Sequence, residues 1–382
     1  MTRKERLSEA VRCRPVDKVP YATYNLHPYA AETGCGGSSR TLSNQHTTDP
    51  SYRELLDQVC ARAGAMIKIN AGGIGPGLSR ADDNLCEVRV EGSGDERTKT
   101  TVVHTRQGDL TAVTRIPECK PSMITKPLIS SDAEIARYMS IPYAAPLFDI
   151  GNIRALYESA GDRALLMVAY SEPMYAVASL FDFEDFSVRC ITDLEKLLQF
   201  IDWAYERSHE NLRLLLEACS GMKLLFHTSG PEICCPPMLN PGLFPKLVTP
   251  YTARLIELIH AHGQLAGIHC HGRVREVFLE MVRTGTDLLE PIEPPPQGNI
   301  GLSELMTQAG GRLCLMGHIQ DQELYTAKPG EMRAKVQEIA RVVNGRTGYI
   351  MSPTCTPFEH PCSATYRRNY LEWLDAAEEL LA

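Results

Sequence analysis

Short apolar runs alternate with longer amphipathic segments along most of this chain. Eight of the runs have the length of buried strands, and they lie near residues 19–24, 65–70, 164–169, 223–227, 265–268, 287–290, 312–316 and 348–351. Between the runs, apolar residues recur at intervals of three and four, as they do along one face of a helix. Alternating strands and helices predict a parallel sheet, and eight such units predict an α/β fold of the (β/α)8 TIM barrel type.

The longest helices are predicted over residues 192–219 and 241–262, and a closing helix is predicted over residues 363–381. Thr192 and Ser131 each stand three residues before a glutamate at the start of a helical pattern. This spacing is typical of a capping box, in which the hydroxyl and the carboxylate bind the first backbone amides of a helix. We therefore expect helices to begin at these two residues.

One stretch, residues 84–116, departs from this alternation. Polar and β-branched residues alternate there around the turn-forming segments 92–95 and 107–109. This pattern predicts a small antiparallel β insertion after the second barrel strand. The chain has 382 residues, whereas a barrel needs about 250. The insertion and an N-terminal cap account for the excess, so we expect a single domain over residues 1–382.

Charge and hydropathy narrow the classes of partner. The 39 Lys and Arg residues are outnumbered by 47 Asp and Glu residues, which argues against nucleic acid and anionic membranes as partners because both require basic surfaces. No apolar run approaches the roughly 20 residues of a membrane span, and residues 1–6 lack the apolar core of a signal peptide. We expect a soluble cytoplasmic protein whose thirteen cysteines are reduced, and whose ligand is a small molecule or another protein.

Polar residues collect at the C-terminal ends of the predicted strands, where barrel enzymes build their active sites. We predict that Glu232 is a general acid or a substrate-binding group, and that His227, Tyr170 and Glu172 line the same pocket. Equally good interpretations are a loop carboxylate that caps a helix for Glu232, a packed phenol for Tyr170 and a solvated carboxylate for Glu172. The residues of this kind, in chain order, are Tyr170, Glu172, His227, Glu232, His269, His271, Glu290, Glu293, His318 and Cys355.

The motif Gly267-Ile-His269-Cys270-His271-Gly272 is the sharpest local feature. Residues two apart in an extended segment point to the same side, so His269 and His271 can share one metal ion, while Cys270 points to the opposite face. Two histidines that merely satisfy their hydrogen bonds in a loop are an equally good interpretation of this short motif. The adjacent Cys234 and Cys235, in a loop bounded by prolines, are predicted to pack rather than to chelate.

Zinc binds histidine nitrogen, cysteine sulfur and carboxylate oxygen, and catalytic zinc sites commonly keep one position open. Cys355 and either Glu290 or Glu293 would complete such a set with His269 and His271. The residues themselves do not decide between the two glutamates. A buried thiol without a metal is the alternative interpretation of Cys355.

Three segments, 269–294, 313–319 and 352–357, resemble the uroporphyrinogen decarboxylase-like superfamily, and residues 16–20 are similar to its N-terminal opening. The similarity covers nearly the whole chain and implies a TIM barrel. This superfamily contains tetrapyrrole decarboxylases and zinc-dependent methyltransferases that act with a methylated corrinoid protein.

The decarboxylases carry an Arg-Gln-Ala-Gly-Arg stretch early in the chain and a Gly-His-Gly stretch near the last strand, whereas this chain has Tyr24-Asn-Leu-His27-Pro28 and Met351-Ser-Pro-Thr-Cys355 there. The methyltransferase branch resembles H-x-C followed downstream by a cysteine, and a related methionine synthase barrel adds a glutamate between them. The order in this chain is similar, and the resemblance implies a zinc site of His269, His271, Glu293 and Cys355.

This chain departs from the resemblance at one ligand, because His271 stands where a cysteine is expected. A neutral imidazole in place of a thiolate makes zinc a stronger Lewis acid, which favours polarisation of a substrate oxygen. We therefore expect transfer of a methyl group between a small methoxy or O-methyl substrate and a corrinoid (cobalamin) cofactor. No Asp-x-His-x-x-Gly motif is present, so a separate partner protein would carry the corrinoid. The alternatives are a decarboxylase acting on a tetrapyrrole or a smaller acid, and a noncatalytic barrel that binds a tetrapyrrole or corrinoid.

Overall fold

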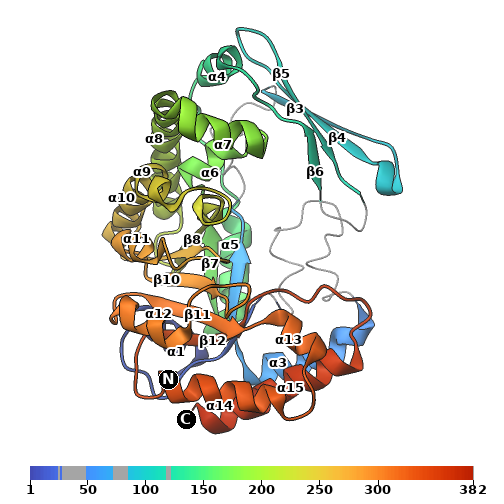
Figure 1. Ribbon diagram of the computed structural model, residues 1–382, viewed down its shortest axis with the longest axis vertical. Coiled ribbons are helices and arrows are strands. Elements are labelled where there is room, and N and C mark those ends of the chain that lie inside the picture. Colours follow the sequence, from blue (N-terminus) through green and yellow to red (C-terminus); the bar gives the residue numbers. More distant parts are fainter. Residues whose placement is uncertain (25, 28–48, 72–84, 118–121, 382) are drawn as a thin grey trace.

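The computed structural model describes residues 1–24, 26–27, 49–71, 85–117 and 122–381 (Figure 1). Eight parallel strands follow one another around a sheet in the order β1-β2-β7-β8-β9-β10-β11-β12. Tyr21 forms a parallel bridge with Met351, which joins the first strand region to the last and closes the barrel. The strands are β1 (Ala22–Tyr24), β2 (Gly64–Ile69), β7 (Ala164–Ala169), β8 (Leu225–Ser229), β9 (Leu265–His269), β10 (Leu288–Ile292), β11 (Cys314–Ile319) and β12 (Tyr349–Pro353).

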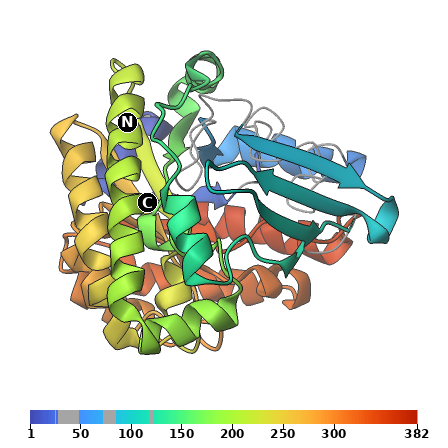
Figure 2. The ribbon, with the colours of Figure 1, turned by 90° about the horizontal axis from the view of Figure 1, so that it is seen from above.

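The eight predicted runs all contain or overlap these strands, and the predicted (β/α)8 barrel is confirmed. Helices flank the strands (Figures 1 and 2). They are α1 (Arg3–Val11), α3 (Arg53–Arg62), α4 (Asp132–Met139), α5 (Ile150–Ala160), α6 (Pro173–Ala178), α7 (Phe183–Thr192), α8 (Leu194–Ala218), α9 (Phe244–Leu247), α10 (Thr249–Ala261), α11 (Phe278–Arg283), α12 (Leu302–Ala309), α13 (Asp321–Thr326), α14 (Glu331–Val343) and α15 (Ala364–Leu380). Among the residues described, no helix has the length and apolar character needed to cross a membrane.

The barrel interior is filled at one end by α1, the predicted N-terminal cap. Leu7, Ala10 and Val11 of this helix are buried against apolar side chains that point inward from the strands. Leu7 lies against Gly64 at the start of β2, so α1 closes the N-terminal end of the barrel. The strand residues of this interior cluster are Ala22, Met66, Leu165, Met167, Leu225, Leu265, Leu288, Cys314, Met316 and Ile350.

The predicted β insertion is a four-stranded antiparallel sheet beside the barrel (Figures 1 and 2). Its strands are β3 (Cys86–Glu91), β4 (Thr98–Val103), β5 (Leu110–Arg115) and β6 (Met123–Lys126). The predicted boundary at residue 116 was too early, because β6 is exposed along its whole length and shows no alternation of buried and exposed residues. Residue 84, the predicted first residue, lies outside the described part.

Two helix predictions need correction. The helix predicted over residues 192–219 begins later, because Thr192 ends α7 and donates its hydroxyl to the Val188 carbonyl, so Thr192 is not a cap. The helix predicted over residues 241–262 is split at Val248 into α9 and α10, because Pro250 lacks the amide hydrogen that would continue it. The start at Ser131 is confirmed, since its hydroxyl accepts a hydrogen bond from the Glu134 amide at 3.3 Å.

Candidate metal and catalytic site

Charged side chains lie above the apolar filling, toward the C-terminal ends of the strands. Lys68 stands two residues after Met66 on β2, and Glu290 stands two residues after Leu288 on β10. Since alternate residues of a strand share a face, each polar side chain points into the barrel directly above an apolar one. His227 has the same relation to Leu225 on β8. The strand pattern therefore builds a polar layer on an apolar floor.

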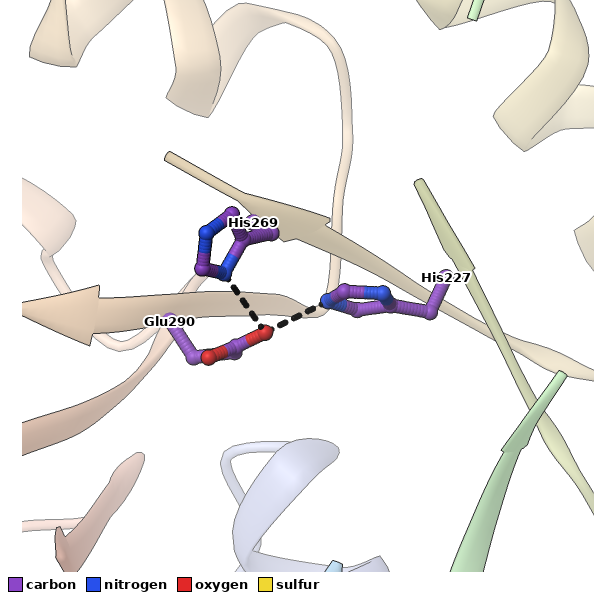
Figure 3. Close-up of side chains that lie close together, drawn as sticks. All are labelled: His227, His269 and Glu290. Atoms are coloured by element: carbon purple, nitrogen blue, oxygen red, sulfur yellow. Dashed lines mark hydrogen bonds and ion pairs between the residues drawn. The ribbon is translucent and has the colours of Figure 1, made fainter. Parts of the chain in front are cut away.

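The polar layer centres on one carboxylate oxygen (Figure 3). Oε1 of Glu290 lies 2.6 Å from Nε2 of His227, 3.2 Å from Nδ1 of His269 and 2.8 Å from Nζ of Lys68. Glu290 is fully buried, and His227 is almost so. Three strands, β8, β9 and β10, contribute the three side chains that point at one another in Figure 3.

Opposing effects set the charge of Glu290. Burial alone would raise its pKa, but the positive charge of Lys68 and the hydrogen bonds from the two histidines hold the pKa well below the usual value for Glu. Burial and, after it, the positive charge of Lys68 lower the pKa of His227 to about 4. An ionised carboxylate has no proton to give, so a neutral His227 donates from Nε2.

Gly267 on β9 lets the side chain of His227 on β8 pass over β9 and reach Glu290 on β10. Gly267 pairs in register with His227 on one side and with Leu288 on the other. A Cβ atom at this position would lie 3.3 Å from Cδ2 of His227 and 2.8 Å from Cδ2 of Leu225. The missing side chain therefore leaves the space through which the imidazole meets Glu290.

A second group lies nearer the mouth of the barrel. Ligand atoms of Glu232, His269 and His271 all lie within 4.8 Å of one another. Glu232 belongs to the short 3-10 helix η6 (Pro231–Cys234) that follows β8, and its carboxylate accepts a hydrogen bond from the Gly230 amide at 2.9 Å. His269 is shared with the deep group, which joins the two.

Each of the two histidines of the group nearer the mouth has a carboxylate beside its Nδ1 atom. For His269 the carboxylate is Glu290, and for His271 it is Glu293, whose Oε2 lies at 3.7 Å and also accepts a hydrogen bond from the Gly272 amide. The neighbouring Glu293 raises the pKa of His271. A carboxylate at Nδ1 fixes the ring orientation and leaves Nε2 as the metal-binding atom, which is the usual arrangement around metal-bound histidine.

The group nearer the mouth fits zinc in the chemistry of its donors, since two imidazoles and a carboxylate are common zinc ligands. The deep group of His227, His269 and Glu290 has the right atoms too, but the ammonium group of Lys68 already lies against its carboxylate. A metal ion bound there would be repelled by the positive charge of Lys68. The donors around Glu232 are therefore the better metal site.

The structure brings together only part of the predicted zinc set. His269 and His271 lie in one group, and Glu293 lies behind His271. Cys355 is exposed on the segment after β12 and belongs to neither metal-capable group of the described residues. The four-ligand set remains a prediction. Cys270 points away from the histidines, as predicted, and its sulfur meets that of Cys235 in the surrounding core.

Tyr170 and Glu172 are both more deeply buried than residues that line a substrate pocket need to be. Tyr170 is buried, and its hydroxyl has no hydrogen-bond partner in the described part of the chain. Glu172 caps α6 by accepting a hydrogen bond from the Tyr175 amide at 2.6 Å, and burial raises the pKa of Glu172 to about 8. The catalytic roles predicted for Tyr170, His227 and Glu232 remain predictions.

Sequence reasoning missed Lys68. The apolar run at residues 65–70 predicts a buried strand but gives no role to the single lysine within it. The available signal was its position, two residues after an inward-pointing methionine, because lysine is rarely placed in an interior without an anionic partner.

Comparisons with known proteins address the family and the fold. A search of curated proteins found no match. Among solved structures, a methyltransferase from Methanosarcina mazei is similar over the full length of both chains, with a TM-score of 0.61 and 16% identity. A D-psicose 3-epimerase from Clostridium cellulolyticum H10, with a TM-score of 0.36 and 10% identity, matches 60% of this chain and 83% of its own.

The first of these likenesses agrees with the barrel derived above. The family comparison goes further, because the model of uroporphyrinogen decarboxylase (URO-D) matches residues 111–363, from the insertion sheet through the last barrel strand. That span includes every residue of both metal-capable groups. Lys68, which pairs with Glu290, lies outside it. Because this match covers more than half of the chain, the chain belongs to the uroporphyrinogen decarboxylase family.

Proposed function

We propose that this protein is a zinc-dependent methyltransferase that moves a methyl group between a small O-methyl substrate and a corrinoid cofactor on a partner protein. The observation that carries the proposal is the group of Glu232, His269 and His271 at the mouth of a URO-D family barrel. The likeness in fold to a methyltransferase over the full chain is consistent with it.

In this proposal, His269, His271 and Glu232 hold the metal and Cys355 is a fourth ligand. Glu293, first predicted as a ligand, instead orients His271 through Nδ1. Zinc, when bound, supplies Lewis-acid polarisation of the oxygen that carries the methyl group. A donor set with two neutral imidazoles suits an oxygen-bearing substrate better than a thiol.

The deep residues set up this site. Glu290 stays ionised because Lys68 lies against it, and it accepts a hydrogen bond from His269. This bond holds the proton of His269 on Nδ1 and directs Nε2 toward the mouth. His227, neutral and almost fully buried, donates a hydrogen bond to the same oxygen.

Metal analysis and a methyl-transfer assay test the proposal together. We expect about one zinc per chain in purified protein, and its loss in His269→Ala. With free cob(I)alamin and a panel of O-methyl compounds, we expect methylcobalamin to form, as followed by its absorbance. Lys246→Ala, on α9 and outside both groups, is the matched control.

Two results would count against the proposal. Turnover of a thiol acceptor without turnover of any O-methyl donor would reject the substrate class. Metal-free protein that releases carbon dioxide from a porphyrinogen would instead favour the decarboxylase alternative. In the described residues, however, the cation beside the deep carboxylate is the lysine Lys68.

A further inference from the structure

Two buried cysteine sulfurs touch behind the histidines of the site. Sγ of Cys235 lies 3.5 Å from Sγ of Cys270, at van der Waals contact, and both residues are at most 2% exposed. Of the eleven cysteines that the structure describes, these two form the pair in sulfur–sulfur contact. We propose that Cys235 and Cys270 are an oxidisable dithiol site that a small peroxide converts into a disulfide.

The position of the pair connects it with the metal-capable group. Cys270 stands between His269 and His271, with its side chain on the opposite face of the strand end. Cys235 directly follows the 3-10 helix η6 as its C-terminal cap, three residues after Glu232. The two sulfurs therefore join the two segments that carry all three donors of the group nearer the mouth.

The oxidation balances with hydrogen peroxide as the oxidant. One sulfur attacks a peroxide oxygen, the O–O bond breaks, and a sulfenic acid and water are formed. The second sulfur then attacks the first, the S–O bond breaks, and the thiol proton leaves with hydroxide as a second water. Two sulfurs lose two electrons in total, and peroxide gains them. Contact between the sulfurs favours the second step over further oxidation, because the resolving thiol is already in place.

Burial determines which oxidant fits. Thiols that are this well covered exclude a bulky disulfide such as oxidised glutathione from direct attack, whereas hydrogen peroxide is close to water in size. By contrast, Cys355 is exposed at the mouth and has no sulfur neighbour among the described cysteines, so it has no partner for a disulfide within the described chain.

The consequence of the disulfide rests on the proposed function. Movement of the η6 segment away from the end of β9 would separate Glu232 from His269 and His271 and so release a metal. A covalent link between Cys235 and Cys270 opposes that movement. We expect the oxidised protein to release zinc several-fold more slowly than the reduced protein.

Peptide mapping tests the dithiol itself. The full-length protein is treated with hydrogen peroxide, denatured, alkylated and digested, and cross-linked peptides are identified by mass spectrometry. We expect a Cys235–Cys270 cross-link in the wild type and in Cys219→Ala, which removes a buried thiol elsewhere. The cross-link should be absent from Cys270→Ala and Cys235→Ala. Its absence from the wild type, or a bond from Cys235 to Cys234 instead, would overturn the proposal.

A chelator-capture measurement tests the consequence separately. Zinc-loaded protein, oxidised or reduced, is mixed with a chromophoric chelator, and the rate of zinc transfer is followed. Equal rates for a fully cross-linked and a reduced sample would overturn the link to the metal site. A protein that binds no zinc in either state would contradict the proposed function, while the peptide map would still decide the dithiol.

Discussion

At the scale of single residues, Lys68 and Glu290 determine the state of the deep group. The carboxylate is fully buried, and the ammonium is one-fifth exposed at 2.8 Å. Removing one member of such a pair leaves an uncompensated charge in a low-dielectric interior, which costs more than the pair gains by forming. Removal of either residue therefore leaves the charge of the other uncompensated, so the effects of the two on stability are coupled.

Lys68→Met should lower the free energy of unfolding by about 3 kcal/mol at pH 7, because Glu290 is left buried without its cation. Urea unfolding measures the change. Adding Glu290→Gln to Lys68→Met should restore much of the lost stability. Lys196→Met, which removes an exposed lysine paired with Asp132, is the control and should leave the unfolding midpoint unchanged. Equal destabilisation by the single and double variants would show that the charge is not the cause.

Gly267→Ala should also act at this scale. The added Cβ would approach Leu225 to 2.8 Å and His227 to 3.3 Å, so we expect a loss of about 1–3 kcal/mol and displacement of the imidazole from Glu290. Urea unfolding gives the first, and NMR of the His227 ring gives the second. In Gly151→Ala on α5, the new Cβ meets only ordinary contacts, so this control should be as stable as the wild type or more so. An unmoved His227 ring in Gly267→Ala would contradict our account of the glycine.

At the scale of elements, the residues of the deep group all stand on strands, whereas the group nearer the mouth takes Glu232 from the segment after β8. His227, His269 and Glu290 stand on β8, β9 and β10, whose positions are fixed by backbone hydrogen bonds. Glu232 stands on η6, whose backbone hydrogen bonds lie within its own turn. Ligands on loops move more readily than ligands on strands. We therefore expect metal affinity to depend most strongly on the position of η6.

Gly230→Ala tests that element. Gly230 has a φ of 121°, and a Cβ there would lie 2.2 Å from Cγ of Tyr175 on α6. Strain and clash together should displace η6 with Glu232, and we expect at least a tenfold loss of zinc affinity in a chelator competition. Gly221→Ala has a similarly positive φ of 87° with open space around it, so it should lose stability but keep its zinc affinity. Unchanged affinity in Gly230→Ala would remove Glu232 from the metal site.

At the scale of the whole molecule, several buried carboxyl groups make stability depend on pH. Burial raises the pKa of Glu172 to about 8 from an ordinary value of 4.5, and burial also raises the pKa of Asp321 to about 8. Between these values the folded protein keeps a proton that the unfolded chain has lost. The contribution of these two carboxyl groups to the free energy of unfolding therefore falls as the pH rises from about 4.5 to about 8.

Glu172→Gln should flatten this slope, because glutamine stays neutral and can still accept the Tyr175 amide hydrogen. Relative to the wild type, the variant should be more stable at pH 8.5 than at pH 5 by about 2–4 kcal/mol. Urea unfolding at the two pH values measures this difference. Asp321→Asn should flatten the slope in the same direction. Parallel pH profiles for wild type and Glu172→Gln would reject a buried, protonated Glu172.

Local sequence patterns were sufficient to predict the eight strands, the closing helix and the family. Apolar runs and helical spacing report which face of each element is buried, and that information is local. The pattern was less informative where burial does not alternate, as in β6, and where a proline interrupts a helix that otherwise continues its apolar face, as at Pro250. The choice of His269 and His271 as a pair also needed only local spacing.

The partners of those histidines, by contrast, depend on how the chain folds. Glu290 and Glu293 are three residues apart and looked interchangeable in sequence, yet one lies inside the barrel against Lys68 and the other lies outside that group beside His271. Lys68 is more than 200 residues away from Glu290 in the chain, and Glu232 reaches the histidines only because β8 and β9 are neighbours. Such contacts arise from closure of the barrel, which brings together residues that no short segment of sequence contains.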